Sequence, residues 1–497
     1  MTTSTPIDQT HGYSYSREDW QAGYRSLHNE FDYWIDDITG EIPPELTGTL
    51  FRNGPGLLEI GGTPIQHPFD GDGMVCAIAF QDGKAHFRNR YVRTEGYCAE
   101  QDADAILYRG VFGTQKPGGA LANAFDFRLK NIANTNIIYW GEKLLALWEA
   151  AEPHRLNPHT LETIGLDHLD GVLEQGDSFA AHPRVDPSCQ FTDGEPCLVN
   201  FSIQPGLSTR INLYEFYPSG KLRRRYSHNV AGFAFIHDFA ITPNYVIFFQ
   251  NPMAFNPVPF ALGLRGPGEC ISFQADKPTR IIVIPRQPSG QAIHLETQSG
   301  FVFHHANAFE KDDKLVVDSV CYSGFPEVEP NQDFRQIDFD KIPEGQLWRF
   351  ELDLGQETVT RSQLESRCCE FPWVHPSHAG RPYRYVYLGA AAQPTGNAPL
   401  QAILKADLET GDRQLWSAAP QGFAGEPLFV PRLNSTAEDD GWVMTLVFNA
   451  AHGRSELVIL DAQDISQGPI ATLRLKHHVP YGLHGSFVPQ YFGPETL

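Results

Sequence analysis

Four histidines lie in separate apolar segments and could meet at one point. They are His182 in SFAAHPRVDP, His237 in FAFIHDFAIT, His304 in GFVFHHANAFE and His484 in VPYGLHGSF. A buried imidazole needs a partner for each ring nitrogen, and neutral imidazole is the commonest metal ligand in proteins. One metal ion shared by all four rings is the economical interpretation, and it predicts a metalloenzyme. The alternative is four separately hydrogen-bonded core histidines.

The ligand types narrow the choice of metal. Four neutral imidazoles leave a divalent ion its full charge, and a six-coordinate ion would keep two open positions; this set differs from the two-His-one-carboxylate site of many iron oxygenases. Structural zinc is normally closed by four ligands and commonly uses Cys, so the chemistry favours a redox role for iron. Neighbours on a strand point to opposite faces, so only one of His304 and His305 can reach a common centre. The residues alone leave that choice open.

Three glutamates stand among apolar residues, where an unpaired carboxylate is costly. They are Glu149 in KLLALWEAAEP, Glu370 in SRCCEFPWVHP and Glu426 in FAGEPLFVP. Metal-bound imidazoles usually donate their second N–H to a carboxylate, so these three are predicted to hold the rings. The alternative is pairing with Arg or backbone amides. Glu152 and Glu365 are expected to be solvated.

Composition excludes several functions. The 497-residue chain carries a net charge of −22, which argues against nucleic acid because phosphate binding requires a basic surface. No run approaches the roughly 18 apolar residues of a membrane span, and the polar N-terminus does not resemble a signal peptide. We expect a cytoplasmic protein with a loose tail over residues 1–15 and one domain over 16–497. The eight cysteines form no C-x-x-C pair, and buried reduced thiols are expected.

Hairpin patterns recur along the whole chain. Each has an apolar strand, a turn rich in Asp, Asn, Pro or Gly, and a second strand. They are AIAFQDGKAHFRNRYV from Ala77, RLNPHTLETIGL from Arg155, LYEFYPSGKLRRRYS from Leu213, WRFELDLGQETVT from Trp348, ILKADLETGDRQLWS from Ile403 and LVILDAQDISQGPIATLRL from Leu457. Continuous apolar runs such as NYVIFFQ suit strands buried on both faces. An all-β propeller is favoured, because distant blades meet at its axis; a large sandwich is the alternative.

Some familiar motifs are missing or fail. The sequence has no H-E-x-x-H, G-x-S-x-G or G-x-x-x-x-G-K-[ST] segment. FDGDGMV, from Phe69 to Val75, begins like a calcium loop but lacks Gly at the sixth and Glu at the twelfth position from Asp70. We expect a tight turn with glycines at positive φ instead. Two insertions interrupt the hairpin pattern, one beginning at Gly110 and one at Asn251.

A family resemblance covers nearly the whole chain from Leu50. The segments LFRNGPG, HPFDGDGMV, LLALWEAAEPHRL, FIHDFAIT, FHHANAFE, EFPWVHP, GEPLFVPR and LHGSF, in this order, resemble the carotenoid cleavage oxygenases. The resemblance implies a seven-bladed β-propeller with a helical and loop cap over an axial metal site. It implies Fe(II) held by His182, His237, His304 and His484, and thereby selects His304 over His305. Glu149, Glu370 and Glu426 become the imidazole partners, and Thr135 would limit access to an open metal position.

The reaction implied by the resemblance is cleavage of one conjugated C=C bond by O2. The substrate would be a lipophilic polyene such as an apocarotenoid, and the products a retinal-type and a shorter carbonyl compound. Aromatic residues near the motifs are candidate tunnel walls, with ordinary core packing as the alternative: Phe69, Trp148, Phe235, Phe303 and Phe371. A lignostilbene-type dioxygenase, a retinoid isomerohydrolase and a non-catalytic propeller are the other interpretations. The three apolar-embedded glutamates argue against the last.

A lipophilic substrate also implies peripheral contact with membranes. The two insertions carry the apolar residues that look exposed: Val111, Phe112, Leu121, Phe125 and Phe127, and Met253, Phe255, Val258, Phe260, Leu262 and Leu264. An apolar patch of this kind marks a membrane or ligand entrance. Because the net charge opposes attraction to anionic lipid, docking would depend on apolar burial. The alternative is that these residues pack over the propeller as a cap.

Overall fold

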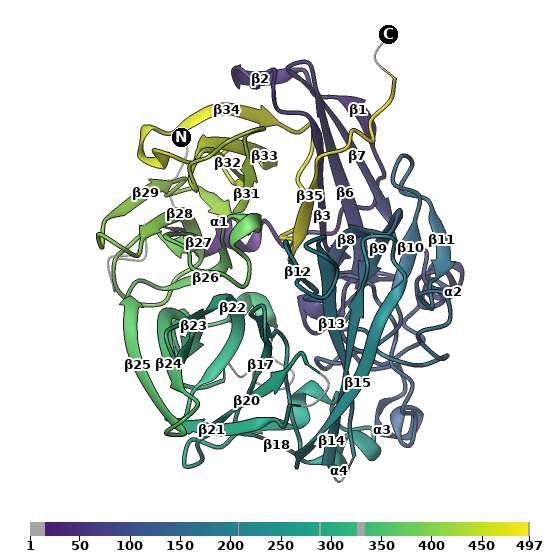
Figure 1. The fold of residues 1–497 in the computed structure, drawn as a ribbon. Coiled ribbons are helices and arrows are strands. Elements are labelled where there is room, and N and C mark those ends of the chain that lie inside the picture. The colour runs from purple at the N-terminus through teal and green to yellow at the C-terminus, as the bar shows by residue number, and fades with distance from the viewer. Residues whose placement is uncertain (1–14, 207, 288–289, 326–332, 496–497) are drawn as a thin grey trace.

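Seven antiparallel sheets stand around one axis in the computed structural model, which describes residues 15–206, 208–287, 290–325 and 333–495 (Figure 1). Five of the sheets use strands in chain order from the axis outward. They are β8 (Asn136–Trp140), β9 (Lys143–Leu147), β10 (His154–Leu156) and β11 (Thr163–Leu166); β12 (Arg184–Asp186), β13 (Cys197–Gln204), β14 (Ser208–Phe216) and β15 (Leu222–Ala231); β16 (Ala240–Ile241), β17 (Tyr245–Gln250), β20 (Thr279–Pro285) and β21 (Ile293–Thr297); β22 (Phe301–Lys311), β23 (Lys314–Tyr322), β24 (Gln346–Asp353) and β25 (Thr358–Glu365); β26 (Cys369–Trp373), β27 (Tyr385–Ala391), β28 (Leu400–Asp407) and β29 (Arg413–Ser417). This arrangement confirms the predicted seven-bladed propeller.

Strands from the two ends of the chain close the ring. One sheet contains β35 (Gly485–Val488), β3 (Gly48–Leu57), β6 (Asp72–Gln81), β7 (Lys84–Tyr91) and β1 (Asp32–Trp34). The other contains β30 (Gly422–Ala424), β31 (Leu428–Pro431), β32 (Gly441–Asn449), β33 (Arg454–Asp461), β34 (Pro469–Arg474) and β2 (Asp37–Gly40). The C-terminal β35 pairs with β3, Thr49 opposite Val488, and places the yellow and purple ends of the chain side by side (Figure 1).

All six predicted hairpins are antiparallel strand pairs in the structure. The hairpin of β20 and β21 escaped the pattern, because the connection of residues 286–292 is much longer than a tight turn. Inner strands are apolar on both faces because each sheet packs between two neighbours. In β17, Phe248 packs on Phe201 of one adjacent sheet, with ring centroids 5.1 Å apart, and Phe249 packs on Phe350 of the other, also at 5.1 Å.

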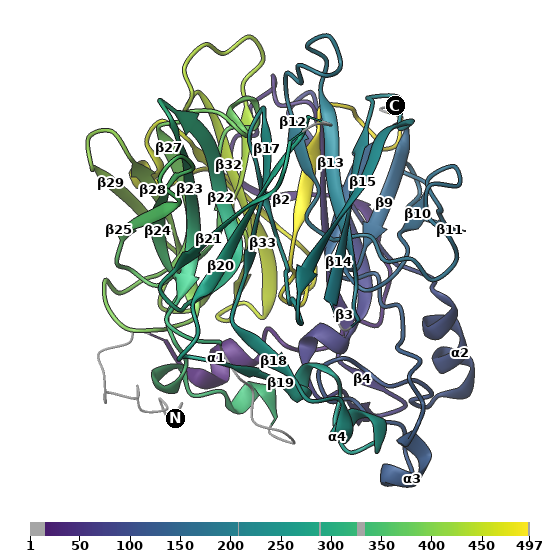
Figure 2. The same ribbon diagram turned by 60° about the horizontal axis from the view of Figure 1, so that its bottom comes forward.

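Helices and short strands cover one end of the axis and confirm the predicted cap (Figure 2). They include α1 (Arg17–Gln21), α2 (Glu95–Ala103), α3 (Gly119–Asn123), α4 (Pro257–Ala261), β4 (Glu59–Ile60), β5 (Thr63–Pro64), β18 (Met253–Phe255) and β19 (Ile271–Phe273). Short 3-10 helices are η1 (Pro68–Asp70), η2 (Gly268–Cys270), η3 (Phe334–Gln336), η4 (Phe339–Lys341), η5 (Pro376–His378) and η6 (Ile465–Gln467). None of the helices in the described ranges has the length and hydrophobicity needed to cross a bilayer.

The predicted tail, residues 1–15, lies outside the described residues except for Tyr15. The Tyr15 ring meets Phe339 and Phe423 edge-on, at centroid distances of 6.1 and 6.5 Å. All eight cysteines are free, and only Cys98 is exposed. This agrees with the expectation of buried reduced thiols.

The FDGDGMV segment is not the turn that we expected. Pro68–Asp70 forms η1, Gly71 has a φ of −74°, and Gly73 lies in β6 without positive φ. The prediction of glycines at positive φ is therefore wrong. Glycine is required here for close packing, since a Cβ on Gly73 would lie 2.3 Å from the carbonyl oxygen of Ala133.

Candidate metal centre

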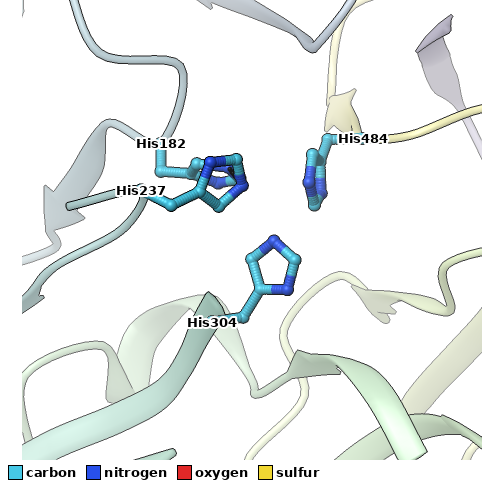
Figure 3. Close-up of side chains that lie close together, drawn as sticks. All are labelled: His182, His237, His304 and His484. Atoms are coloured by element: carbon cyan, nitrogen blue, oxygen red, sulfur yellow. Dashed lines mark hydrogen bonds between the residues drawn. The ribbon is translucent and has the colours of Figure 1, made fainter. Parts of the chain in front are cut away.

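The four histidines of the separate apolar segments meet at the propeller axis (Figure 3). One ring nitrogen from each lies within 4.8 Å of the others, and the Nε2 atoms of His182 and His237 are 2.9 Å apart. Two nitrogens bound to one metal at right angles are roughly 3 Å apart, given metal–nitrogen distances near 2.1 Å. The spacing therefore fits a shared ion.

The inner strands of the seven sheets position the centre. His182, His237 and His484 lie two, three and one residues before the start of β12, β16 and β35, respectively, and His304 lies in β22. The three remaining sheets each place another predicted site residue at the same level: Thr135 before β8, Glu370 in β26 and Glu426 between β30 and β31. Each blade thus contributes at least one side chain to one small volume.

His304 reaches the axis and its neighbour His305 does not. The Nδ1 of His305 lies 2.7 Å from Ser319 Oγ in the adjacent strand β23, and its backbone N–H donates to Asp238 Oδ2. A register shift in β22 at this point separates the two side chains. The geometry thereby agrees with the choice that the family resemblance implied.

Each predicted glutamate holds one imidazole from behind. The Nδ1 atoms of His237, His304 and His484 lie 2.6, 2.6 and 2.9 Å from oxygens of Glu149, Glu370 and Glu426, respectively. An ionised carboxylate can only accept, so each Nδ1 carries the proton and each Nε2 presents a lone pair to the centre. The Nε2 of His304 is buried and has no hydrogen-bond partner among the described residues. An orphaned buried nitrogen of this kind fits a metal ligand.

The pKa values of three of the histidines shift in different directions. Burial, reinforced by the three other imidazoles, holds the pKa of His182 well below its ordinary value. Burial also lowers the pKa of His484, although Glu426 opposes that shift. For His237 the carboxylate of Glu149 outweighs burial and raises the pKa. Burial opposes ionisation of Glu370, but the charge and hydrogen bond of His304 outweigh it and lower the carboxyl pKa.

The three glutamates differ in their other partners. Glu370 accepts from the Tyr322 hydroxyl at 2.9 Å and from the backbone N–H of Phe371 at 2.6 Å. Glu426 forms a buried ion pair with Arg52 and accepts from the N–H of Gly485 at 3.0 Å. The side chain of Glu149 is 28% exposed.

The expectation that Glu152 is solvated is wrong. Its residue is only 8% exposed, and its carboxylate accepts from the N–H of Gly176. The loop that carries Gly176 folds back over it, a contact that the local sequence does not reveal. The same expectation is wrong for Glu365, whose side chain is only 12% exposed and pairs with Arg413 at 2.7 Å.

An apolar cavity of about 190 Å³ opens onto the centre. Its lining includes four of the five predicted wall residues and the predicted access residue: Phe69, Trp148, Phe303, Phe371 and Thr135. It also includes Phe112, Asn134, Tyr322 and Leu483, which sequence reasoning did not assign to the site. The fifth predicted wall residue, Phe235, is not among the described residues that line this cavity. Its ring instead stacks on that of Phe301, with centroids 6.0 Å apart.

Phe371 is held in a strained backbone conformation at the cavity wall. Its φ is +54°, which is unfavourable for a bulky side chain. The ring lies 5.7 Å from that of His304 and 5.3 Å from that of His484. The hydrogen bond from the Phe371 N–H to Glu370 helps to hold this conformation, so the strain is tied to the site.

A second group of potential ligands, Asp186, Cys189 and Cys197, is already satisfied. The guanidinium of buried Arg286 donates to Asp186 at 2.7 Å and lies 3.3 and 3.1 Å from the two sulfurs. Because a fixed positive charge occupies the position that a cation would take, this group is not a second metal centre.

The chain belongs to the carotenoid oxygenase family. The family model described as RPE65, retinal pigment epithelial membrane protein, matches residues 24–489, which confirms the resemblance seen in the motifs. The chain is 57% identical to the apocarotenoid-15,15'-oxygenase of Synechocystis sp. over 488 residues, 98% of this chain and 99% of that protein. It is 31% identical to lignostilbene-alpha,beta-dioxygenase isozyme III of Sphingomonas paucimobilis, over 93% of this chain and 95% of that one.

The solved structures agree with the fold. The crystal structure of cobalt-substituted Synechocystis ACO superposes with a TM-score of 0.95 at 58% identity, and the match covers 96% of this chain and 99% of that chain. The fold and the order of the blades are therefore those of this family.

Proposed function

We propose that this protein is a non-haem Fe(II) dioxygenase that cleaves one conjugated C=C bond of an apocarotenoid with O2. The products would be a retinal-type carbonyl compound and a shorter one. The observation that carries the proposal is the convergence of four Nε2 lone pairs, three of them backed by carboxylates, at the end of an apolar cavity. The 57% identity to a protein named apocarotenoid-15,15'-oxygenase supports the substrate class.

The charges around the centre suit a divalent ion. Glu149, Glu370 and Glu426 with the guanidinium of Arg52 carry a net charge of minus two at neutral pH. A divalent cation would neutralise this buried group, which lowers the cost of burying each charge. Bound iron would supply the redox chemistry that couples O2 to the double bond.

The protein's own part in the reaction is to hold and orient. The three glutamates fix the ring orientation and the tautomer of their histidines. Thr135, at the cavity wall, would restrict access to an open metal position, and the aromatic residues Phe303 and Phe371 would hold the polyene against the centre. The low polarity of these walls excludes water, which protects a reactive intermediate from side reactions. We propose that residues 16–497 form one catalytic domain for this reaction.

A second cavity suits a long substrate. It has a volume of about 260 Å³ and shares Phe69, Phe371 and Leu483 with the cavity at the metal centre. A rod-like polyene passing this shared wall would place one half in each cavity and an internal double bond near the metal. Such a shape favours an apocarotenoid over the shorter stilbenes.

The test is incubation of the iron-loaded protein with apocarotenals and, separately, with a lignostilbene under O2. Mass analysis should find a retinal-type aldehyde and a shorter aldehyde, each with one oxygen atom gained at the cleaved carbon. Cleavage of the stilbene with untouched apocarotenals would favour the lignostilbene-type alternative. No product from either substrate, with stoichiometric iron bound, would contradict the proposed function.

We also propose that the cap docks on membrane surfaces. Six of the eleven apolar insertion residues form an exposed patch, with these exposed fractions: Leu121 95%, Phe125 72%, Phe127 58%, Val258 58%, Leu262 45% and Leu264 60%. Helices α3 and α4, which carry Leu121 and Val258 of this patch, lie together at the free end of the cap (Figure 2). The other five are not exposed: Val111, Phe112, Met253, Phe255 and Phe260. Phe255 stacks on Phe233, and Phe260 lies under the Arg109 guanidinium.

Arg109 joins the two halves of the patch. Its side chain is fully buried, and one end donates to the carbonyl oxygens of Asn123 and Asp126 while the other donates to those of Phe260 and Arg265. A single guanidinium thus fixes both apolar segments in one surface. This pre-ordering supports a binding role, because a loose pair of loops would lose entropy on docking.

Replacing Leu121 and Phe125 together by Asp should weaken binding to phosphatidylcholine vesicles about tenfold or more, because burial of each large apolar side chain contributes about 1.5–3 kcal/mol. Vesicle co-flotation measures the effect. The matched control is Ile164→Asp, a 61% exposed residue on the outer strand β11. Binding that falls equally in the control, or that disappears in high salt, would contradict docking by this apolar patch.

A further inference from the structure

The acidic motif from Phe69 to Val75 has no role in the function proposed so far. Its first carboxylate, Asp70, is only 5% exposed. Asp70 Oδ1 accepts from the backbone N–H of Phe112 at 2.9 Å, and Oδ2 accepts from that of Thr114 at 3.1 Å. Burial raises the pKa of Asp70 to about 6, while these donors oppose the rise. Asp70 forms no ion pair among the described residues, and a carboxylate buried without a cationic partner is costly, so its position calls for an explanation.

Asp70 connects two aromatic walls of the metal-centre cavity. Phe69 is its immediate neighbour, and the amide of Phe112 is bound to its carboxylate. Both rings line the cavity, and their centroids are 5.5 Å apart in an edge-to-face contact. His67 packs against both rings, at 4.6 and 5.1 Å, and its Nδ1 accepts from the N–H of Phe69.

The segment bound by Asp70, residues 110–114, is a strap between the cavity and the cap. It follows Arg109, which clamps the two halves of the exposed apolar patch. The carbonyl oxygen of Val111 accepts from the N–H of Gly268 at 2.8 Å, which ties the strap to the second insertion. Gly110 has no room for a side chain, since a Cβ there would lie 2.3 Å from Asp70 Oδ2. The strap therefore sits directly on the carboxylate.

We propose that Asp70 is a positioning residue that fixes the 110–114 strap, so that Phe69 and Phe112 set the width of the cavity and with it the selection among polyene substrates. This inference rests on the proposed function for the class of ligand. Asp70 acts through the two rings and makes no contact with the substrate itself. A purely structural role would stabilise the cap without changing which polyene fits.

The decisive variant is Asp70→Asn. The amide keeps the shape, but its NH2 group must face one of two N–H donors, so at least one hydrogen bond to the strap is lost. Hydrogen exchange of the amides in residues 110–114 should accelerate about tenfold or more, the effect expected for a hydrogen bond to a charged group. The matched control is Asp126→Asn, a cap carboxylate paired with Lys116 and Arg128 that accepts no hydrogen bond from the strap among the described contacts. It should leave exchange in the strap unchanged.

Selectivity among polyenes is measured from binding affinities alone, so the result does not depend on catalytic activity. Two apocarotenals of different chain length are titrated into the protein without O2, and the ratio of their Kd values is compared. Asp70→Asn should reduce the ratio about tenfold, the size of effect that a wall displaced by about one methylene produces. Phe112→Ala should do the same, and the double variant should add little, because two residues acting through one wall are not additive.

Several outcomes would overturn the inference. A protected strap in Asp70→Asn, an unchanged Kd ratio despite a loosened strap, or full additivity with Phe112→Ala would each do so, as would a wild type that binds neither apocarotenal. Binding with the expected selectivity but no cleavage under O2 would count against the proposed function alone. A thermal-melting measurement on each variant confirms that it is folded.

Discussion

His237→Ala and His484→Ala should each remove both metal binding and cleavage, with activity falling to the detection limit. The four imidazoles come from four different blades, so the loss of one leaves a site open on one side and no neighbouring residue can replace it. In His484→Ala the buried Glu426 also loses its imidazole partner, which adds a cost in stability. Metal analysis of purified protein should give about one iron per chain for the wild type.

The matched pair His304→Ala and His305→Ala makes this test specific. The two residues are adjacent on β22 and both buried, but only His304 faces the centre. His305→Ala should lose the hydrogen bond to Ser319, at about 1–3 kcal/mol of stability, and retain its metal. A fully active His304→Ala protein, or equal metal loss in both variants, would rule out the four-histidine site.

The propeller was predictable because its evidence is local. Each hairpin has its own turn residues and its own apolar strand pattern, so it can be recognised from the sequence without any long-range contact. Six such hairpins spread along the chain indicate radial repetition. Local patterns did not reveal the number of blades. The long connection between β20 and β21 made one hairpin unrecognisable, and the ring closes by pairing of β35 with β3, from opposite ends of the chain. The number of blades followed from the family resemblance instead, and the pairing that closes the ring was not predicted.

The metal centre was predictable to the extent that its residues break the apolar pattern. An imidazole or a carboxylate among apolar neighbours must have a partner, which identified six of the seven residues by type; the choice of His304 over His305 needed the family resemblance. Phe112 and Tyr322 gave no such signal, because an aromatic residue in an apolar or loop segment is ordinary. Phe112 lies in a loop, and its backbone N–H donates to Asp70, a tertiary contact that the local sequence does not reveal. The exposure of Glu152 was predicted wrongly because the loop at Gly176 that covers its carboxylate is placed there by tertiary structure.

Glu149→Gln, Glu370→Gln and Glu426→Gln should each weaken metal affinity or activity roughly 10–100-fold, the usual consequence of losing the partner behind a metal-bound imidazole. The amide keeps the shape, but a neutral oxygen is a poorer acceptor for the Nδ1–H and stabilises the bound ring less. Metal competition with a chelator and steady-state kinetics measure the two effects separately.

The three variants should differ in stability. Glu426→Gln leaves the buried Arg52 without its counter-charge, and breaking such a pair typically costs about 3–5 kcal/mol. Glu370→Gln loses part of the hydrogen-bond network with Tyr322 and Phe371. Glu149 is partly exposed, and among the described side-chain contacts its carboxylate pairs with His237. We therefore expect denaturation midpoints to fall most for Glu426→Gln and least for Glu149→Gln, although all three impair the metal site.

Glu152→Gln is the control that isolates the role of the imidazole contact. Glu152 is a buried carboxylate near Glu149 in the sequence, but it binds the backbone of Gly176 and does not contact any of the four histidines among the described interactions. Its replacement should lower stability modestly and leave metal affinity within about twofold of the wild type, because no ligand ring depends on it. If Glu152→Gln loses metal as readily as the other three, burial of a carboxylate near the axis is the relevant property, and the assignment of Glu149, Glu370 and Glu426 as the residues that orient the ligands is wrong.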